Sequence, residues 1–417
     1  MITQVEISGY KSLRDVKLQL RPLTVIVGPN ASGKSNLFDA LRLLSAMATQ
    51  PDLKTAFDAH RGIPVEAFFT EQGIHHSLQQ SNLKLRITVD VSLSDQAVNV
   101  TEKRIRDLRE GLTAYSARHV TESNLRYSLA VEFLPETAVL RVADERLVAL
   151  KKDGNERKSR NPFFERAGDK LSLRMEGQAH PTMHDVGLPY TIVSQPLYAP
   201  HYPHITAFKE ELARWSFYYF DPILMRENTP LKEVRAIGPN GQDLAGYFFN
   251  LKAKNPRQFD ELSRTLRQVV PAVSGMDVRR TDEGFVELLI VEDEVSYSSR
   301  VISEGTLRVL GLLAILSSQE DNTTIGFEEP ENGVHPRRIE LTAKILSERA
   351  RSMSQQLLVT THSPLMPKYF ENADLVVAYR DGHQSEFTPF PPKAPMLKPD
   401  DIDTALDERI IRGDLGG

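Results

Sequence analysis

The sequence predicts an α/β protein with a mixed central sheet, an antiparallel β meander and a globular insert. Three observations lead to this fold class. A glycine-rich loop stands between a short apolar run and an amphipathic helical segment near the N-terminus. Two apolar runs near the C-terminus end in acidic residues and in a histidine. Between these regions, three segments alternate apolar and polar residues, which is typical of half-buried strands.

The glycine-rich loop at residues 28–35 reads Gly-Pro-Asn-Ala-Ser-Gly-Lys-Ser and matches G-x-x-x-x-G-K-[ST] at each fixed position. The apolar, β-branched residues 23–27 predict a buried strand before it. Residues 36–47 have helical spacing with one apolar face. Strand, loop and helix in this order form the context that the pattern needs to bind phosphate. A glycine-rich turn with a chance lysine is the weaker interpretation.

The backbone N–H groups of this loop and the following helix N-terminus are expected to bind the phosphates of ATP. Lys34 would place a positive charge on the β- and γ-phosphates, and the Ser35 hydroxyl would coordinate Mg²⁺. ATP and Mg²⁺ are therefore the predicted ligands. The predicted nucleotide-binding residues of the loop are Asn30, Ala31, Ser32, Gly33, Lys34, Ser35 and Asn36.

Residues 323–327 form another predicted apolar strand, which ends at Glu328 and Glu329. A carboxylate in this place can hold Mg²⁺ through a water molecule, and we assign this role to Glu328. The next carboxylate can polarise the attacking water, and we assign this role to Glu329. Glu328 and Glu331 are the alternatives for the second role. Taken alone, these residues also fit an acidic loop without catalytic function.

His362 follows a predicted strand at residues 356–361 and is expected to donate a hydrogen bond to the γ-phosphate. A single histidine at a strand end is more often structural. Ser303 opens a predicted amphipathic helix over residues 304–316 and can be a plain N-cap. Alternatively, Ser303 and Gly305 at this helix N-terminus bind a phosphate presented by a second protomer.

The chain resembles the SMC/RecF branch of the ABC ATPases. More narrowly, it resembles the stand-alone ATPases related to the OLD family, which occur in DNA repair and anti-phage systems. The resemblance covers about the first 50 and the last 180 residues. Two residues depart from the common SMC pattern. Glu328 stands where most SMC proteins have Asp, and the signature reads Ser303-Glu-Gly-Thr instead of Ser-Gly-Gly. Both variants resemble the OLD-related branch. The segments that carry the resemblance are residues 9–15 (GYKSLRD), 28–35, 303–305, 327–336 (FEEPENGVHP) and 360–364 (TTHSP).

This resemblance implies hydrolysis of ATP to ADP and phosphate by a homodimer. Each ATP would be held between the loop of one head and the Ser303 signature of the other. It also implies that the ATP state is coupled to DNA or to a separate effector protein, such as a nuclease or a toxin. The glutamine that such ATPases use to sense Mg²⁺ is not assigned, and Gln79 and Gln80 are only weak candidates.

Roughly 270 residues separate Ser35 from Ser303, and they contain no sustained heptads. The insert is therefore predicted to be globular rather than a coiled-coil arm. Alternation over residues 83–93, 125–133 and 138–150 predicts an antiparallel meander. Other segments predict a basic helix at 101–112, a buried aromatic strand rather than a base-stacking platform at 215–220, and helices at 244–251 and 259–269.

Two polar clusters in the insert leave alternatives open. Residues 151–160 carry five basic and two acidic residues at a predicted hairpin tip. This tip is either a solvated loop or a contact for nucleic-acid phosphates. Four histidines near Asp185 either bind a metal ion or belong to a polar surface, and they are His180, His184, His201 and His204.

The predicted organisation has four segments. Residues 1–80 and 222–380 form the two parts of the ATPase head, residues 81–221 the antiparallel β structure and insert, and residues 381–417 an irregular tail. Strand 374–379, proline-rich residues 389–399 and a helix at 401–411 are expected near the end. Because only about 55 residues follow His362, we expect no nuclease domain and a separate effector polypeptide.

Composition is consistent with a soluble protein, since 40% of the 417 residues are hydrophobic and 26% are charged. There are no cysteines, which excludes disulfides and cysteine-ligated metal sites. No signal peptide or transmembrane segment is predicted, so a cytoplasmic location without a membrane partner is expected. The net charge of −5 indicates no general affinity for nucleic acid, although a local basic strip would suffice for DNA.

The sequence thus predicts an ATP-hydrolysing head that dimerises on ATP and engages DNA or an effector. A first alternative is a scaffold that binds ATP, hydrolyses it slowly and restrains or activates a toxin or nuclease. A second alternative is a repair mediator that acts directly on DNA ends or gaps.

Overall fold

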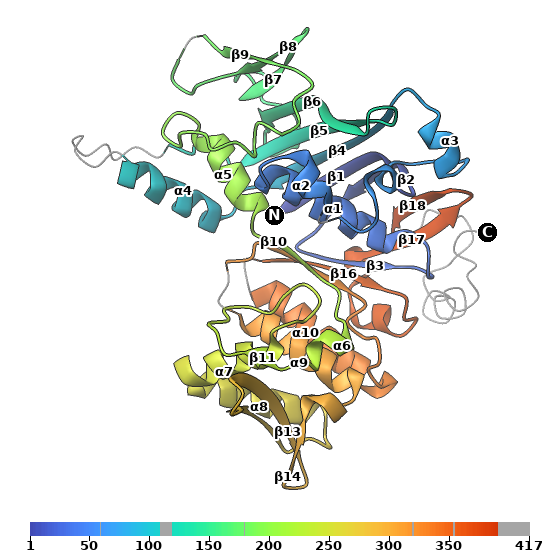
Figure 1. Ribbon diagram of the computed structural model, residues 1–417, viewed down its shortest axis with the longest axis vertical. Coiled ribbons are helices and arrows are strands. Elements are labelled where there is room, and N and C mark those ends of the chain that lie inside the picture. Colours follow the sequence, from blue (N-terminus) through green and yellow to red (C-terminus); the bar gives the residue numbers. More distant parts are fainter. Residues whose placement is uncertain (59, 109–118, 179, 319–320, 353–354, 391–417) are drawn as a thin grey trace.

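The computed structural model describes residues 1–390 apart from 59, 109–118, 179, 319–320 and 353–354. Two large sheets and a smaller third sheet follow one another along the long axis of the molecule, with helices between them (Figure 1). This arrangement confirms the predicted α/β class. The predicted helix at 401–411, the end of the predicted helix at 101–112 and most of the proline-rich segment lie outside the described residues.

The first sheet has eight strands, all antiparallel to their neighbours. The predicted meander is confirmed as β4, β5 and β6. The structure adds β1 and β2, so this sheet combines strands from both sides of residue 80. In spatial order the strands are β2 (Leu13–Gln19), β1 (Ile2–Tyr10), β4 (Leu83–Ser92), β5 (Asn124–Leu134), β6 (Val139–Ala149), β7 (Phe164–Ala167), β8 (Lys170–Leu173) and β9 (Thr182–Asp185).

The second sheet is mixed, as predicted, because five parallel strands are followed by one antiparallel strand. Parallel strands end at the same edge of a sheet, and ligands bind at that edge. The ends of β3, β15 and β16 therefore bring the loop, the two glutamates and His362 together. In spatial order the strands are β10 (Trp215–Tyr218), β15 (Thr324–Glu328), β16 (Gln356–Thr361), β3 (Leu23–Val27), β17 (Leu375–Asp381) and β18 (Gln384–Pro389).

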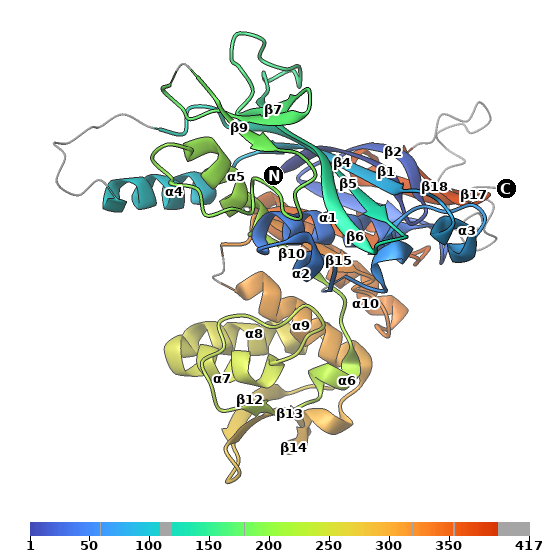
Figure 2. The same cartoon turned by 45° about the horizontal axis from the view of Figure 1, so that its top comes forward.

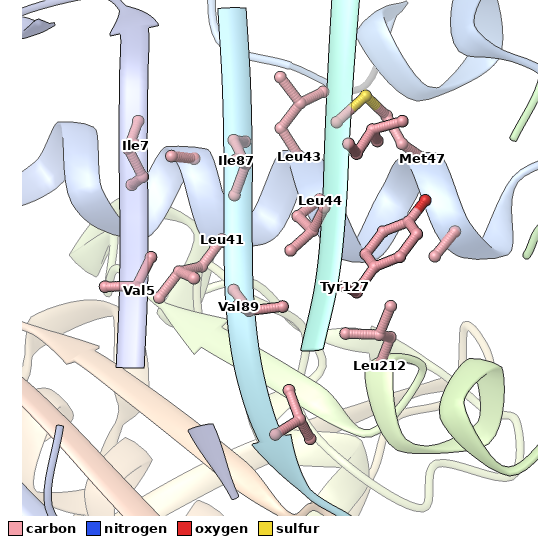
Figure 3. Packing of buried hydrophobic residues seen from close by; sticks show 14 of the residues in the cluster. Val5, Ile7, Leu41, Leu43, Leu44, Met47, Ile87, Val89, Tyr127 and Leu212 are labelled. Atoms are coloured by element: carbon pink, nitrogen blue, oxygen red, sulfur yellow. The ribbon is translucent and has the colours of Figure 1, made fainter. Parts of the chain in front are cut away.

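Helix α1 (Lys34–Thr49) is fixed between these two sheets. Figure 3 shows Leu41 and Leu44 of α1 beneath Ile87 and Val89 of β4. On the opposite side of α1, the Phe38 ring lies 5.4 Å from the Phe217 ring of β10. Each fully buried side chain of this size stabilises the fold by roughly 1.5–3 kcal/mol. The packing fixes the helix, and the helix in turn fixes the loop that precedes it.

The other face of the six-stranded sheet packs on α9 (Glu304–Ser317) and α10 (Pro336–Ser352). Beyond them lies a distal lobe, which we define as residues 222–302; Figure 2 shows it on the side away from the eight-stranded sheet. Helices α7 and α8 confirm the predicted pair, whereas the strands of this lobe were not predicted. Its elements are α6 (Pro222–Met225), β11 (Thr229–Pro230), α7 (Leu244–Lys254), α8 (Pro256–Val269), β12 (Gly275–Arg280), β13 (Phe285–Glu292), β14 (Val295–Ser298) and the 3-10 helix η2 (Ser299–Val301).

The insert between α1 and α9 is globular, as predicted, because its longest described helices have 14 residues. Helix α4 starts six residues before the predicted basic helix. Within the described residues, no helix is both long and apolar enough to cross a membrane. The division of the chain at residues 80, 221 and 380 stays a prediction. The remaining helices are α2 (Leu53–Asp58), η1 (Pro64–Ala67), α3 (Ile74–Leu78), α4 (Asp95–Leu108), α5 (Pro203–Leu212), η3 (Met366–Tyr369) and η4 (Asn372–Asp374).

Candidate nucleotide-binding site

The glycine-rich loop connects β3, which is buried over its whole length, to the first turn of α1. The Gly28 N–H donates to the Thr361 carbonyl over 3.2 Å, which ties the loop to the end of β16. Gly33 has a φ of 95°, and an added Cβ there would clash with the Ser385 side chain, so glycine is required. The loop amides therefore lie at the N-terminus of a 16-residue helix, which favours anions.

Lys34 is buried beneath this loop and is only 5% exposed. Its Nζ donates to the carbonyl oxygens of Gly28 and Pro29, each over 2.7 Å. Burial lowers the pKa of Lys34, and Glu329, Glu331 and Glu328 oppose that shift. These two carbonyl acceptors are neutral. An anionic phosphate oxygen would be a stronger acceptor for the Lys34 ammonium group.

Glu328 is the last residue of β15 and is 3% exposed. Burial raises the pKa of Glu328 against the opposing effects of the Ser35 hydroxyl and Arg61. Its Oε1 is buried without a hydrogen-bond partner among the described residues, and Arg42 Nη2 lies 4.0 Å from it. A carboxylate oxygen without a partner beside a hydroxyl is a suitable donor set for Mg²⁺. The residues therefore fit the predicted metal, with Ser35 and Glu328 as its ligands.

Glu329 leaves the strand in a left-handed backbone conformation, with a φ of 48°. Its Oε2 accepts a hydrogen bond from Asn332 Nδ2 over 2.6 Å, and its Oε1 lies 3.1 Å from His362 Nδ1. The two residues that were predicted to be catalytic are thus brought together from the ends of β15 and β16. Asn332 was not predicted, and it orients the carboxylate.

Glu331 is a third carboxylate at the site, considered in the sequence only as an alternative base. Its side chain is buried, and its Oε1 accepts a hydrogen bond from the Thr361 hydroxyl. Its Oε2 has no hydrogen-bond partner. Burial raises the pKa of Glu331, and His362 opposes this shift. Glu331 is therefore held by Thr361, the residue before His362, and acts electrostatically on the Glu329–His362 pair.

A chain of charges along α1 also reaches the site. Lys11 Nζ lies 2.8 Å from Asp39 Oδ2, and Asp39 Oδ1 lies 3.8 Å from Arg42 Nη1. Arg42 continues the chain to Glu328. Asn36, which was predicted to bind nucleotide, donates to the Ser12 hydroxyl over 2.7 Å and so fastens the β1–β2 turn to α1. Of these residues, Lys11 belongs to the segment GYKSLRD that carried the resemblance, whereas Asp39 and Arg42 had no sequence signal.

The signature residues lie at the N-terminus of α9. Ser303 is exposed, and its Oγ accepts from the Thr306 N–H over 3.3 Å, as an N-cap does. Gly305 packs so closely on the Gly333 carbonyl that an added Cβ would clash with it. Among the described residues, the hydrogen bonds of Ser303 stay within its own helix turn. The signature residues thus lie on a different helix from the loop, and their contact with a nucleotide stays a prediction.

The histidine cluster is not a metal site in the described part of the chain, where no group of three ligating side chains is found. His204 is fully buried, and its Nε2 accepts from the N–H groups of Thr121 and Glu122. Its Nδ1 lies 2.7 Å from Glu176 Oε2. Because both ring nitrogens are engaged, His204 is a structural residue.

Comparison with solved structures shows which fold the chain has. Two solved structures match nearly the whole chain at 12% identity. One is an Smc head bound to the C-terminal winged-helix domain of ScpA, with a TM-score of 0.52 over 93% of this chain and 97% of that chain. The other is an Smc head with an extended coiled coil bound to the C-terminal domain of ScpA, derived from Pyrococcus furiosus, with a TM-score of 0.53 over 99% of each chain. At this identity the likeness shows the fold, which is that of an SMC-type ATPase head.

No curated protein matches the chain significantly. A family profile does match, over residues 23–366, which extend from the start of β3 to beyond His362. That range contains the loop, the signature and the carboxylates. The chain therefore belongs to the ATPase family described as "AAA domain, putative AbiEii toxin, Type IV TA system".

Proposed function

We propose that the protein binds Mg²⁺–ATP at the loop of residues 28–35 and hydrolyses it with Glu329 as the general base. The observation that carries this proposal is the 3.1 Å approach of Glu329 to His362 at the sheet edge where the loop begins. Glu329 also acts electrostatically on Lys34, so the base and the phosphate-binding lysine share one site. A positioned base beside a phosphate cradle is what activation of a water molecule requires.

Each residue has a separate role in this reaction. The loop N–H groups and Lys34 bind the β- and γ-phosphates. Ser35 and Glu328 would hold Mg²⁺, which supplies neutralisation of phosphate charge when bound. Glu329 takes a proton from water as the water oxygen bonds to the γ-phosphorus, and the bond from that phosphorus to the β–γ bridging oxygen breaks. His362 donates a hydrogen bond to the γ-phosphate, and ADP and phosphate leave.

We further propose that two copies of the chain close on ATP, with Ser303 and Gly305 of one copy facing the nucleotide of the other. The exposed Ser303 hydroxyl at the N-terminus of a 14-residue helix supports this, because such an end attracts phosphate.

The test mixes two inactive variants. Lys34→Ala removes phosphate binding, and Ser303→Arg blocks the signature surface, so a mixed dimer keeps one intact composite site. Mixing should restore hydrolysis that neither variant shows alone. A protein that stays monomeric at full activity in ATP would contradict the dimer.

The ATP state is proposed to be passed to DNA or to a separate nuclease or toxin. The family description names a toxin–antitoxin system, and the two Smc heads each carry a domain of ScpA, which is a precedent for a head of this fold docking a second polypeptide. The two alternative functions can be distinguished by experiment. A scaffold that restrains its partner would bind ATP and hydrolyse it slowly, whereas a repair mediator would bind DNA in the presence of ATP.

The basic turn at 151–160 is the proposed contact surface, but only part of it is available. Arg157 and Arg160 both pair with Glu122, at 3.3 Å and 3.4 Å, and Arg160 also pairs with Glu176 at 2.6 Å. These two arginines therefore fasten the turn to the molecule. The exposed residues left for a partner are Lys151, Lys152 and Lys158.

Charge reversal of these three lysines to Glu should weaken DNA or effector capture and reduce its salt dependence, while ATP binding is retained. The matched control reverses Lys232, Lys252 and Lys254 in the distal lobe, which changes the net charge equally. Equal losses in both variants would show a general charge effect and remove the turn from the proposal.

A further inference from the structure

Arg308, in the second turn of α9, is a buried cation that has no counter-ion among the described residues. Its side chain is 7% exposed, and its Nε and Nη1 atoms are buried without a hydrogen-bond partner. A guanidinium group stays charged at all relevant pH values, so it cannot escape this cost by losing its proton. An uncompensated buried charge destabilises a folded chain strongly. Its position therefore calls for an anion that the described part of the chain does not supply.

From helix geometry, the Arg308 side chain is expected to lean toward the N-terminus of α9. Helix side chains lean toward the helix N-terminus, and residues three apart share a face. The residue three positions before Arg308 is Gly305, which has no side chain to block that path. On the same face, Gly305 contacts the Gly333 backbone. A guanidinium group that follows this direction approaches the helix end that already carries a positive partial charge, which is the unfavourable end for a cation.

We propose that Arg308 binds the terminal phosphates of an ATP molecule that is held by a second copy of the chain. This inference rests on the proposed ATP-bound dimer. A guanidinium group offers parallel N–H donors that match phosphate oxygens, and charged hydrogen bonds of this kind are the strong ones. Together with the exposed Ser303 hydroxyl and the N-terminus of α9, it forms a positive surface that suits a polyanion rather than a single carboxylate.

The proposal predicts opposite effects on the two states of the protein. Without nucleotide, Arg308→Met removes an unpaired charge and keeps the side-chain length, so thermal stability should stay equal or rise. With ATP, the same variant loses a phosphate contact at both sites of the dimer, so association should weaken by about tenfold or more. A purely structural arginine would give the reverse pattern, in which stability falls.

The experiment uses the full chain with Glu329→Gln as the parent, which should retain ATP without turnover. Sedimentation in Mg²⁺–ATP gives the dissociation constant of the dimer. Equilibrium dialysis of dilute protein gives the ATP affinity of single chains, and thermal unfolding without nucleotide gives the stability of the fold. Arg308→Met is compared with Arg308→Lys, expected to be intermediate, and with Arg264→Met, an exposed arginine on α8.

The expected result for Arg308→Met is weaker dimerisation, unchanged ATP affinity of the single chain and undiminished stability. Unchanged dimerisation, or a stability loss without nucleotide, overturns the inference while the dimer itself stands. A parent that binds ATP but does not associate overturns the proposed dimer, and the role of Arg308 falls with it.

Discussion

Glu329 Oε1 and His362 Nδ1 lie 3.1 Å apart, although 33 positions separate the two residues. Adjacent parallel strands β15 and β16 bring them to one edge, and the Glu329 N–H donates to the Thr360 carbonyl over 2.9 Å. The left-handed backbone of Glu329 costs on the order of 1–3 kcal/mol, a strain that is typical of functional sites. This turn directs the carboxylate across the end of β16 instead of along its own strand.

His362→Ala should lower ATP turnover by about tenfold or more, because the change removes both a donor to the γ-phosphate and the neighbour of Glu329. ATP affinity should change little, since Lys34 and the loop amides remain. Steady-state phosphate release and equilibrium dialysis measure the two effects. His184→Ala on the exposed strand β9 is the matched control. Equal turnover in both variants would make His362 a structural residue.

Lys34→Ala should abolish ATP binding at micromolar nucleotide and leave the fold intact. Within the described residues, its ammonium group donates to two loop carbonyls, so its removal should leave the sheets and α1 unchanged. Near-UV circular dichroism monitors the fold, and dialysis monitors binding. Lys17→Ala, an exposed lysine paired with Glu6, is the control. A folded Lys34→Ala protein with wild-type ATP affinity would place the nucleotide elsewhere.

The stability of the eight-stranded sheet should depend on pH through Glu145. This residue is buried, accepts from the Tyr127 hydroxyl over 2.8 Å, and burial raises its pKa to about 7. A carboxyl group with a higher pKa in the folded chain than in the unfolded chain stabilises the fold fully when the pH is below its unfolded-state pKa. This contribution is lost as the pH rises through its folded-state pKa. The window is therefore from about pH 4.5 to about pH 7.

Glu145→Gln removes this titration. The free energy of unfolding of the variant, relative to that of the wild type, should therefore be higher at pH 8 than at pH 5. Urea unfolding at the two pH values measures the difference, for which the pKa shift sets an upper bound of about 3 kcal/mol. Comparing the two proteins at each pH cancels the titration of other carboxylates. A variant-to-wild-type difference that is equal at both pH values would contradict the assignment.

Local patterns sufficed for the parts of the site that lie on single segments. The loop, β3 and β16 follow from short runs with strong periodicity, and the bounds of β3 and β16 agree with the prediction. The sequences of β1 and β2 also alternate between apolar and polar residues, and Val5 and Ile7 of β1 are buried beside more exposed neighbours. These two strands were nevertheless not predicted. In the distal lobe, β13 is a nearly continuous buried run and the four residues of β14 are mostly exposed, so neither strand shows regular alternation.

Contacts between distant segments could not be predicted in the same way. Arg42 and Glu328 approach to 4.0 Å only because α1 crosses the sheet, and neither residue type nor spacing indicates that pair. The basic turn gives a second example. Its composition predicted exposure, but the pairing of Arg160 with Glu176 depends on how a loop beyond β8 folds back.

The most direct test of the account is ATP hydrolysis by Glu329→Gln, measured beside ATP binding by the same protein. The substitution keeps the size of the side chain and removes the base, so phosphate release should fall by about 100-fold or more while ATP affinity is retained. Glu331→Gln is the comparison, because that residue is the nearest alternative base. Full turnover in Glu329→Gln, with the loss appearing in Glu331→Gln instead, would contradict the assignment of Glu329 as the base.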